Sequence, residues 1–417
     1  MKLDRRTLLG AGIGLSVSLI PEAGVAAVQK LPPRRRRLSA APPPISASER
    51  VARISRAQAL LRANGMGAVF MEAGPSLTYF SGVVWGRSER LTGMVIPVEG
   101  APLLITPFFE EASVRESLAV PATVRTWNED EDPLTHVGNW LREMQLQDKK
   151  IGIEETVRQF LIEALTKAAP RARLVSGNPV VRGSRMIKSP AEIALMQHAT
   201  DITVSAYART IPKIRRGMSQ DDIENVMTAA MSALGGARPW TLVLVGEASA
   251  YPHGSKNPKT VAANDIILMD CGCESGGYQA DVSRTFVFGT PSAEHRKVWS
   301  AVRRGQEIAL AAARIGATAG SVDAAVRRYY ESLGYGPGYK LPGLSHRTGH
   351  GIGMEGHEPI NLVGNETTRL QPGMCFSNEP GLYAPGNFGV RLEDCFYMTA
   401  SGPRWFSHPS ESIEKPV

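Results

Sequence analysis

Four short blocks in the C-terminal half of this chain restrict its fold more than any other feature of the sequence. They read D-C-G-C-E-S-G-G-Y-Q-A-D, H-R-T-G-H-G-I-G-M-E-G-H-E, N-E-P-G and V-R-L-E-D, and they carry five candidate metal ligands: Asp270, Asp281, His350, Glu379 and Glu393. Carboxylates bridge divalent cations and offset their charge, and one neutral imidazole completes such a site. The fold must therefore bring five side chains that are far apart in the sequence to one point, where they would hold two cations.

The first block predicts a β-hairpin. Asp270 closes the apolar run 265–270, and Asp281 opens a second strand-like run over 281–288. The Gly276-Gly277 pair between the two runs is typical of a tight hairpin turn, because glycine adopts the positive φ angles that such turns require. We therefore expect Asp270 and Asp281 to lie close together on neighbouring strands.

The four blocks in this order resemble the metallopeptidases of the pita-bread fold, in the branch of the Xaa-Pro aminopeptidases and the prolidases (Xaa-Pro dipeptidases). Residues 346–358 follow the pattern H-x-x-[SG]-H-x-[LIV]-G-x-x-[IV]-H-[DE] except at Gly356, where a β-branched residue is usual. The resemblance extends from about residue 50 to residue 410. It implies an α/β (α+β) chain in which a creatinase-like N-terminal α/β domain precedes a pita-bread catalytic domain.

The resemblance also implies a role for each ligand. Asp281 would chelate or bridge, Asp270 would bind on one side, Glu393 would bridge from the far side, and His350 and Glu379 would bind the second ion. The two divalent ions would be Mn²⁺ by family, while Co²⁺ and Zn²⁺ also suit one imidazole among carboxylates. They would share a bridging hydroxide that attacks the peptide bond.

Five side chains are implied as catalytic groups. Glu379 would also carry a proton from the attacking water to the leaving nitrogen. His253 and His357 would contact the substrate and steady the developing negative charge, His346 would line the pocket, and Arg391 would orient a ligand carboxylate. Taken singly, each histidine could equally be a packed structural residue and Arg391 a surface residue, because isolated motifs are weak evidence.

The implied activity is hydrolysis of the N-terminal Xaa-Pro bond by an aminopeptidase or a dipeptidase. Glu379 and Glu393 show the short spacing of small prolidases, which favours dipeptide substrates. One alternative is an amidohydrolase or lyase that acts on a small osmolyte on the same fold, although Gly272 stands where the known lyase variant has a third aspartate. Another alternative is a non-catalytic binding protein, but such relatives typically lose the ligands that this chain retains.

The N-terminus predicts export. Residues 1–27 resemble a twin-arginine signal peptide, with Arg5-Arg6 before an apolar run that is too short for a permanent membrane anchor. The expected location is the periplasm or the exterior, by way of the export machinery; an uncleaved basic tail is the alternative. Residues 28–48, rich in Arg and Pro, predict a disordered linker. The predicted creatinase-like domain spans 49–184 and the predicted catalytic domain spans 185–410.

Most of the net positive charge of the chain lies in residues 1–45. Residues 1–45 hold eight Lys or Arg and two Asp or Glu, or +6 of the total +7, so the remaining 39 basic and 38 acidic residues nearly cancel. This balance gives no electrostatic reason to expect a nucleic-acid partner. The expected partners are a peptide with proline second and, by family, a second copy of the chain in a homodimer.

Local patterns support two domains. Strand-like and helix-like runs alternate in the first, as in an α/β domain, with strands expected over 67–71, 103–106 and 150–154 and helices over 49–63, 109–118 and 133–144. Ser189, Pro190 and Glu192 form a capping box that starts a helix of the second domain. The four cysteines, Cys271, Cys273, Cys375 and Cys395, lack zinc-site spacing and are expected to be buried and reduced, although a bridge in an oxidising compartment stays open.

Overall fold

The computed structural model describes residue 38 and residues 40–417. The predicted signal peptide (1–27) and the start of the predicted linker (28–48) lie outside the described residues. The end of that linker differs from the expected disordered segment: Ile45 packs against buried side chains of the second domain, and the first helix already begins at Ala47. Ser46 accepts a hydrogen bond from the Glu49 backbone N–H, which is the N-cap that ends the extended segment.

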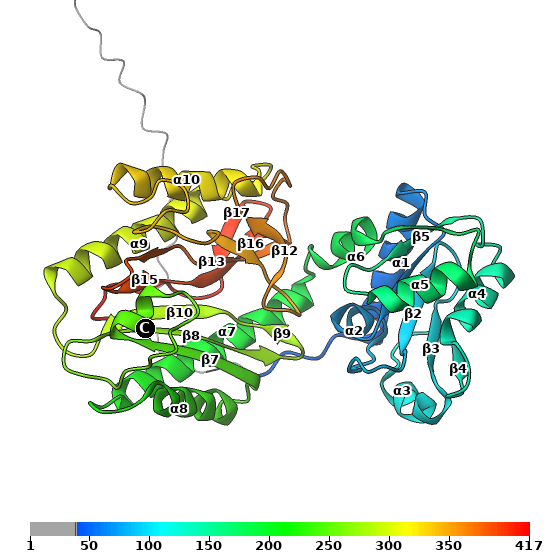
Figure 1. The fold of residues 1–417 in the computed structure, drawn as a ribbon, viewed down its shortest axis with the longest axis horizontal. Coiled ribbons are helices and arrows are strands. Elements are labelled where there is room, and N and C mark those ends of the chain that lie inside the picture. The colour runs from blue at the N-terminus through cyan, green and yellow to red at the C-terminus, as the bar shows by residue number, and fades with distance from the viewer. Residues whose placement is uncertain (1–37, 39) are drawn as a thin grey trace, which may run out of the picture. The chain divides into compact units, whose positions relative to one another are not determined.

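A mixed six-stranded sheet, with the strand order β4-β3-β2-β1-β5-β6, forms the centre of the first domain (Figure 1). Every residue of β1, β2 and β3 is buried, because helices cover both faces of the sheet. This arrangement confirms the expected strand–helix alternation. The strands are β1 (Ala68–Glu72), β2 (Gly93–Pro97), β3 (Leu103–Pro107), β4 (Thr123–Trp127), β5 (Lys150–Ile153) and β6 (Arg173–Ser176). The helices are α1 (Ala47–Ala63), α2 (Pro75–Ser81), η1 (Phe108–Glu110), α3 (Glu111–Ser117), α4 (Pro133–Glu143), α5 (Gln159–Ala168) and α6 (Asn178–Arg185).

The second domain is built from two sheets, each covered by helices on its outer side (Figure 1). The first sheet has the order β10-β8-β7, with β9 paired to the end of β8, and the second has the order β12-β11-β13-β16-β17. The strands are β7 (Ala237–Val245), β8 (Ile266–Ser275), β9 (Tyr278–Gln279), β10 (Val282–Val287), β11 (Gly349–Gly351), β12 (Glu358–Leu362), β13 (Cys375–Asn378), β16 (Asp394–Thr399) and β17 (Gly402–Trp405), and a separate hairpin joins β14 (Gly381–Tyr383) to β15 (Gly389–Arg391).

Two pairs of helices form the outer layers of this domain. Apolar side chains of α7 (Pro190–Thr210) and α8 (Gln220–Ala233) pack on the first sheet, and those of α9 (Ala293–Ala312) and α10 (Ala319–Ser332) pack on the second. The short helices η2 (Ile211–Lys213) and η3 (Gly246–Ala250) follow α7 and β7. None of the helices within residues 40–417 combines the length and the apolar character that a bilayer span requires.

The predicted helix start at Ser189 is confirmed. The Ser189 hydroxyl accepts from the Glu192 N–H and the Glu192 side chain accepts from the Ser189 N–H, with Pro190 in the first turn. The helix α8 has an equivalent capping box between Ser219 and Asp222. Each of these reciprocal pairs satisfies two backbone donors that a helix start would otherwise leave without partners.

The predicted hairpin is present, but one detail of the prediction was wrong. The strand β8 does not end at Asp270; it continues to Ser275, and Asp270 lies in its middle opposite Ser283. Gly276 and Gly277 form the turn with φ angles of 56° and 83°. The prediction ended the strand at the first charged residue, whereas the pairing of β7, β8 and β9 extends the ladder past it.

A buried ion cluster fixes the segment between α6 and α7 to the second domain. Glu358 accepts hydrogen bonds from Arg185 at 2.6 Å and from Lys188 at 2.9 Å, and it also accepts from the Met354 backbone N–H. Burial alone would raise the pKa of Glu358, but the charges of Lys188 and Arg185 and their hydrogen bonds lower it to about 2. The carboxylate is therefore ionised at neutral pH.

Replacing Glu358 with Gln should lower the free energy of unfolding at neutral pH by roughly 3 kcal/mol, because the two buried cations lose their counter-charge. The pKa of Glu358 is about 2 in the folded protein, whereas its ordinary value, which applies to the unfolded chain, is near 4.5. Its stabilising contribution is therefore complete above about pH 4.5 and is lost as the pH falls toward 2. Urea unfolding of both proteins across this range should show the difference between them shrinking as the pH falls.

The matched control for this measurement is Glu355→Gln. Glu355 also contacts Arg185, at 2.7 Å, but its side chain is 42% exposed. We expect this change to cost less than about 1 kcal/mol. Equal losses for the two variants would show that burial of the Glu358 pair does not stabilise the junction.

Candidate metal centre

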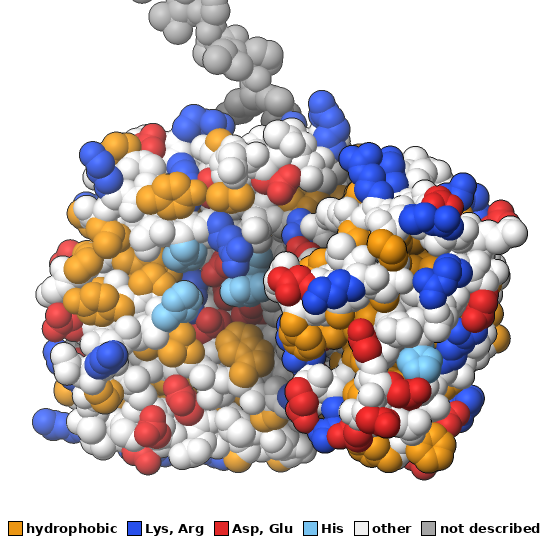
Figure 2. Space-filling model, turned by 45° about the vertical axis from the view of Figure 1, so that its right-hand side comes forward, with side chains coloured by type: hydrophobic (Ala, Val, Ile, Leu, Met, Phe, Trp, Pro, Cys, Tyr) orange, Lys and Arg blue, Asp and Glu red, His pale blue; other side chains and the backbone are white. Residues whose placement is uncertain are grey.

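The five predicted ligands converge between the two sheets of the second domain. One group joins Asp270, Asp281 and Glu393, and a second joins His350, Glu379 and Glu393; within each group the ligand atoms lie within 4.8 Å of one another. These are the two groupings that the sequence predicted for the two ions. Figure 2 shows histidine side chains gathered beside acidic side chains in a hollow on the face of this domain.

The residues present fit a pair of divalent cations. Asp281 Oδ1 and Glu393 Oε1 are buried and have no hydrogen-bond partner among the described residues. Burial, together with the charge of Asp270 on Asp281 and the charge of Asp281 on Glu393, raises the pKa of each of these carboxyls well above its usual range. Buried carboxylate oxygens without donors are costly, and cations would satisfy them.

His350 is prepared to bind a cation through one defined nitrogen. Its Nδ1 lies 3.0 Å from the Gly351 carbonyl oxygen, so this nitrogen carries the proton, and Nε2 presents its lone pair. That Nε2 lies 3.3 Å from Glu379 Oε1 and 3.6 Å from Asp281 Oδ2. Burial, with the nearby His357, lowers the pKa of His350 to about 3, which keeps the imidazole neutral.

Arg391 and Ser283 hold the carboxylates of Asp270 and Glu393 in place. Arg391 donates from Nη2 to Asp270 Oδ2 at 2.6 Å and from Nε to the Ser283 hydroxyl at 3.0 Å. The Ser283 oxygen lies 2.9 Å from Asp270 Oδ1 and 2.8 Å from Glu393 Oε2. A hydroxyl has one proton, so it donates to one of these two carboxylates at a time. Arg391 is only 3% exposed, which sets it apart from a surface arginine.

Glu379 directly follows β13 and has a strongly shifted pKa. Burial raises the pKa of Glu379 to about 7, against the opposing effect of the Arg391 charge. Without bound cations this carboxyl group therefore gains and loses a proton near neutral pH.

His357 and His253 lie at the exposed side of the centre. The ring of His357 lies 4.0 Å from the ring of His350, and its Nδ1 accepts a hydrogen bond from Arg347 at 3.1 Å. In this tautomer Nε2 carries the proton and can donate it to a substrate oxygen, and burial together with Arg347 lowers the pKa of His357. His357 also forms a group with Asp281 and His350 in which the ligand atoms lie within 4.8 Å of one another. His253 is exposed in the turn after η3, near enough to lower the pKa of His357.

Both ring nitrogens of His346 are engaged by other groups of the protein. Its Nδ1 donates to the Arg347 carbonyl oxygen at 2.7 Å, and its Nε2 accepts from the Tyr383 hydroxyl at 2.8 Å. Burial, with the Arg391 charge, lowers the pKa of His346 to about 3, and burial raises the pKa of Tyr383 to about 12. With both ring nitrogens engaged, His346 is placed to orient Tyr383 rather than to contact a substrate directly.

The sequence analysis did not identify three residues that the structure places at the centre: Ser283, Arg347 and Tyr383. Ser283, in β10, lies two residues after Asp281, so strand periodicity could have suggested it. Arg347 and Tyr383 reach the site through irregular segments around β11 and β14, and no periodic pattern marks them.

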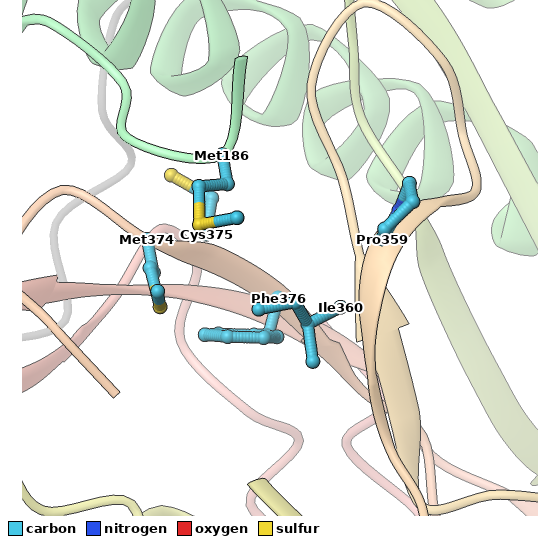
Figure 3. Close-up of a pocket in the computed structure, with 6 residues that line it drawn as sticks. All are labelled: Met186, Pro359, Ile360, Met374, Cys375 and Phe376. Atoms are coloured by element: carbon cyan, nitrogen blue, oxygen red, sulfur yellow. The ribbon is translucent and has the colours of Figure 1, made fainter. Parts of the chain in front are cut away.

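The described residues also include a small apolar pocket, which is a poor candidate for chemistry. Figure 3 shows its lining, which comes from three segments of the second domain: Met186, Pro359, Ile360, Met374, Cys375 and Phe376. Burial raises the pKa of the Cys375 thiol to about 12, so it is an inert thiol. All four cysteines are buried and free, as expected.

The sequence matches the models of two known protein families. Residues 194–400 match the model of metallopeptidase family M24, and residues 53–187 match the model of the creatinase/prolidase N-terminal domain. The chain is 30% identical over 370 residues to a protein named probable dipeptidase PepE from Mycobacterium bovis, covering 88% of this chain and 96% of that one. It is 27% identical over 368 residues to an Xaa-Pro dipeptidase from Lactobacillus delbrueckii subsp. lactis, covering 87% and 98%.

A solved structure shows the same fold. The crystal structure of dipeptidase PepE from Mycobacterium ulcerans superposes with a TM-score of 0.82 at 28% identity, covering 89% of this chain and 98% of that chain. The predicted order of a creatinase-like domain followed by a pita-bread domain is thereby confirmed.

Binding of divalent cations should release protons from this centre. Because the pKa of Glu379 is about 7, and those of Asp281 and Glu393 are raised by burial and by neighbouring carboxylates, the metal-free centre holds at least one proton at about pH 6 that cations displace. Titration calorimetry with Mn²⁺ in buffers of different ionisation enthalpy should detect at least one released proton. The number should fall as the pH rises through about 7, because Glu379 is then already ionised.

The same titration has a structural readout and a control. Cations at about 100 times their dissociation constant should stabilise the fold by about 2.7 kcal/mol. The isosteric variant Asp281→Asn should bind the ions more weakly and release fewer protons. Proton release that stays constant from about pH 6 to about pH 8 would contradict the role of Glu379 in this uptake.

Proposed function

Because this chain belongs to metallopeptidase family M24, we propose that it is a metal-dependent exopeptidase that hydrolyses the bond before proline in Xaa-Pro dipeptides. The observation that carries the proposal is the convergence of His350 and four carboxylates on two overlapping groups of ligand atoms. We assign Asp270, Asp281, His350, Glu379 and Glu393 as the ligands and Mn²⁺ as the metal, with Co²⁺ and Zn²⁺ as the alternatives.

The ions and the protein would divide the work of the reaction. Two bound divalent cations would supply an activated water and polarise the scissile carbonyl group. Glu379 would take a proton at its carboxylate and deliver it to the departing nitrogen, and a proline nitrogen leaves only when it gains this proton. The His357 Nε2–H would donate to the carbonyl oxygen as negative charge develops there. Arg391 and Ser283 would keep Asp270 and Glu393 in position throughout.

Arg347 supports a preference for dipeptides. Its guanidinium donates to His357 and to the Asn361 side-chain oxygen at the exposed side of the centre. Among the residues that the structure describes, Arg347 forms no ion pair at contact distance with a carboxylate, although its charge acts to lower the pKa of Glu379. The C-terminal carboxylate of a dipeptide belongs to the residue directly after the scissile bond. An arginine beside the metal centre would bind this carboxylate by charge-assisted hydrogen bonds. A longer peptide places its carboxylate elsewhere and would lose this contact.

Gly272 counts against the lyase alternative. A side chain at this position would meet the Ala280 carbonyl oxygen at 2.0 Å and the Trp240 ring at 2.7 Å. The third aspartate that marks the known lyase variant therefore cannot be accommodated here without moving the backbone at Ala280 and the Trp240 ring. This close approach explains why the strand requires glycine at this position.

The Mn²⁺-loaded chain should release the first residue from an Xaa-Pro dipeptide, act more slowly on a longer Xaa-Pro peptide, and fail on the same peptide with Ala in place of Pro. The variant Asp270→Asn should lose activity by a factor of at least about 100, because it loses a predicted ligand and the partner of Arg391. Release of the first residue is measured by mass spectrometry. Absence of Asp270-dependent cleavage in a metal-loaded, folded sample would refute the peptidase assignment.

Replacing Arg347 with Gln tests the preference for dipeptides separately. The value of kcat/KM for a free dipeptide should fall by about 10- to 100-fold, the cost of losing hydrogen bonds to a charged group. The corresponding dipeptide amide, which lacks the carboxylate, should change by less than about threefold. Arg171→Gln, at an exposed position of the first domain, is the control. An equal loss on both substrates would mean that Arg347 supports His357 rather than the substrate carboxylate.

Export by the twin-arginine route to the periplasm belongs to the same proposal. It is supported by Arg5-Arg6 before a short apolar run, which is the composition of such signals. Replacing Arg5 and Arg6 with Lys should retain the precursor inside the cell, as measured by immunoblotting of cell fractions. Replacing Arg34 and Arg35 with Lys should leave export unchanged, because these residues lie after the predicted signal. Equal distribution of both variants between fractions would refute the assignment.

A further inference from the structure

The Tyr278 hydroxyl lies in a buried polar cluster between helix α1 and the second domain. It donates to Glu192 Oε1 at 2.8 Å and accepts from Arg53 Nη2 at 3.0 Å. Arg53, from α1, is itself held by Glu49 at 3.1 Å and by the Tyr79 carbonyl oxygen at 2.9 Å. Tyr278 is 1% exposed, Glu192 2% and Arg53 5%, so these bonds are shielded from water. A residue of the first domain thus reaches directly to the β8–β9 hairpin.

The ring of Tyr278 faces a different environment from its hydroxyl. It belongs to a buried apolar cluster that includes Ile352, two residues after His350, and Cys395, two residues after Glu393. The Cys395 thiol also donates to the backbone oxygen of Asp281 at 3.3 Å. The cluster therefore lies directly behind three segments that carry predicted ligands.

The backbone joins Tyr278 to the ligands over a short distance. Tyr278 follows the Gly276-Gly277 turn and pairs with Ser275, and it precedes Asp281 by three residues. The next residue, Gln279, donates from its backbone N–H to the Gly353 carbonyl oxygen at 2.8 Å, which links the hairpin to the segment after His350. A shift of the Tyr278 ring would consequently be passed to Asp281 and to β11.

We propose that Tyr278 is a positioning residue through which Arg53 of the first domain fixes the hairpin that carries Asp270 and Asp281. The hydroxyl has one proton and one acceptor position in use, so Glu192 and Arg53 together determine where the ring lies. Arg53 is placed by two further partners and by the Tyr79 ring, 4.0 Å from its guanidinium carbon. The first domain thereby contributes to metal binding without supplying a ligand. This inference rests on the proposed assignment of Asp281 as a ligand.

The test uses the full chain and Tyr278→Phe, which removes the hydroxyl and keeps the ring in the apolar cluster. The matched control is Tyr330→Phe: Tyr330 is also 1% exposed, but its hydroxyl has no hydrogen-bond partner among the described residues. Mn²⁺ affinity is measured by titration calorimetry, and ligand geometry by the visible absorption spectrum of the Co²⁺-loaded protein. Thermal unfolding of the metal-free proteins accompanies both measurements.

Tyr278→Phe should raise the Mn²⁺ dissociation constant by about tenfold, which is typical for a residue that orients a ligand, and should change the Co²⁺ spectrum. Tyr330→Phe should change neither. Arg53→Lys, which keeps the charge but cannot serve all of its partners, should shift the spectrum in the same direction. Combined with Tyr278→Phe it should add little, because the two changes act through one contact.

An unaltered dissociation constant and spectrum in Tyr278→Phe, with only a lower unfolding temperature, would overturn the inference and leave Tyr278 a structural residue. A wild-type chain that binds no divalent cation would overturn it together with the metal assignment. A wild-type chain that binds Mn²⁺ but cleaves no Xaa-Pro peptide would end the proposed peptidase function alone, because affinity and spectrum still decide the role of Tyr278.

Discussion

Four carboxylates, two of them buried and two partly buried, surround one buried imidazole, and this grouping is the constraint on which the second domain depends. Like charges at this distance repel one another strongly when water is excluded, so the chain must hold them together by other means. Apolar packing holds them together: the outer faces of the two sheets are buried against helices. The ligand-bearing positions are thereby left facing each other between the sheets. Arg391, placed against Asp270, offsets part of the charge, and His350 adds none because it is neutral. The remaining charge is what divalent cations would balance.

The grouping of the five candidate ligands could be predicted from the sequence because these residues stand in short blocks with fixed spacing. The capping box at Ser189 and the Gly276-Gly277 turn were predictable for the same reason: each depends on neighbouring residues. Ser283, Arg347 and Tyr383 were missed because their roles arise only when segments distant in sequence meet. The full length of β8 was missed for a related reason, since its strand partners carry the ladder past Asp270. Local signals thus identify ligands, whereas the residues that orient the ligands depend on the tertiary fold.

The four histidines around the centre show how one residue type is given separate roles by its hydrogen bonds. The backbone oxygen of Gly351 fixes the proton of His350 on Nδ1 and frees Nε2 for a cation, whereas Arg347 fixes the proton of His357 on Nε2 and makes it a donor. His346 has both nitrogens engaged by the protein, and His253 is exposed in a turn. Sequence spacing cannot distinguish these cases, because the deciding partner is a carbonyl oxygen or an arginine brought in by the fold.

The first domain contacts the hairpin that carries Asp270 and Asp281, through the hydrogen bond from Arg53 to Tyr278. A ligand hairpin with two glycines at its turn is locally flexible, because glycine leaves the backbone many conformations. The hairpin therefore needs an external restraint if Asp281 is to keep its position among other carboxylates that repel it. Buried hydrogen bonds to charged groups provide such a restraint with defined geometry, and Tyr278 makes two of them, one to each domain. A domain that carries no ligand can in this way determine how well the ligands of another domain are arranged.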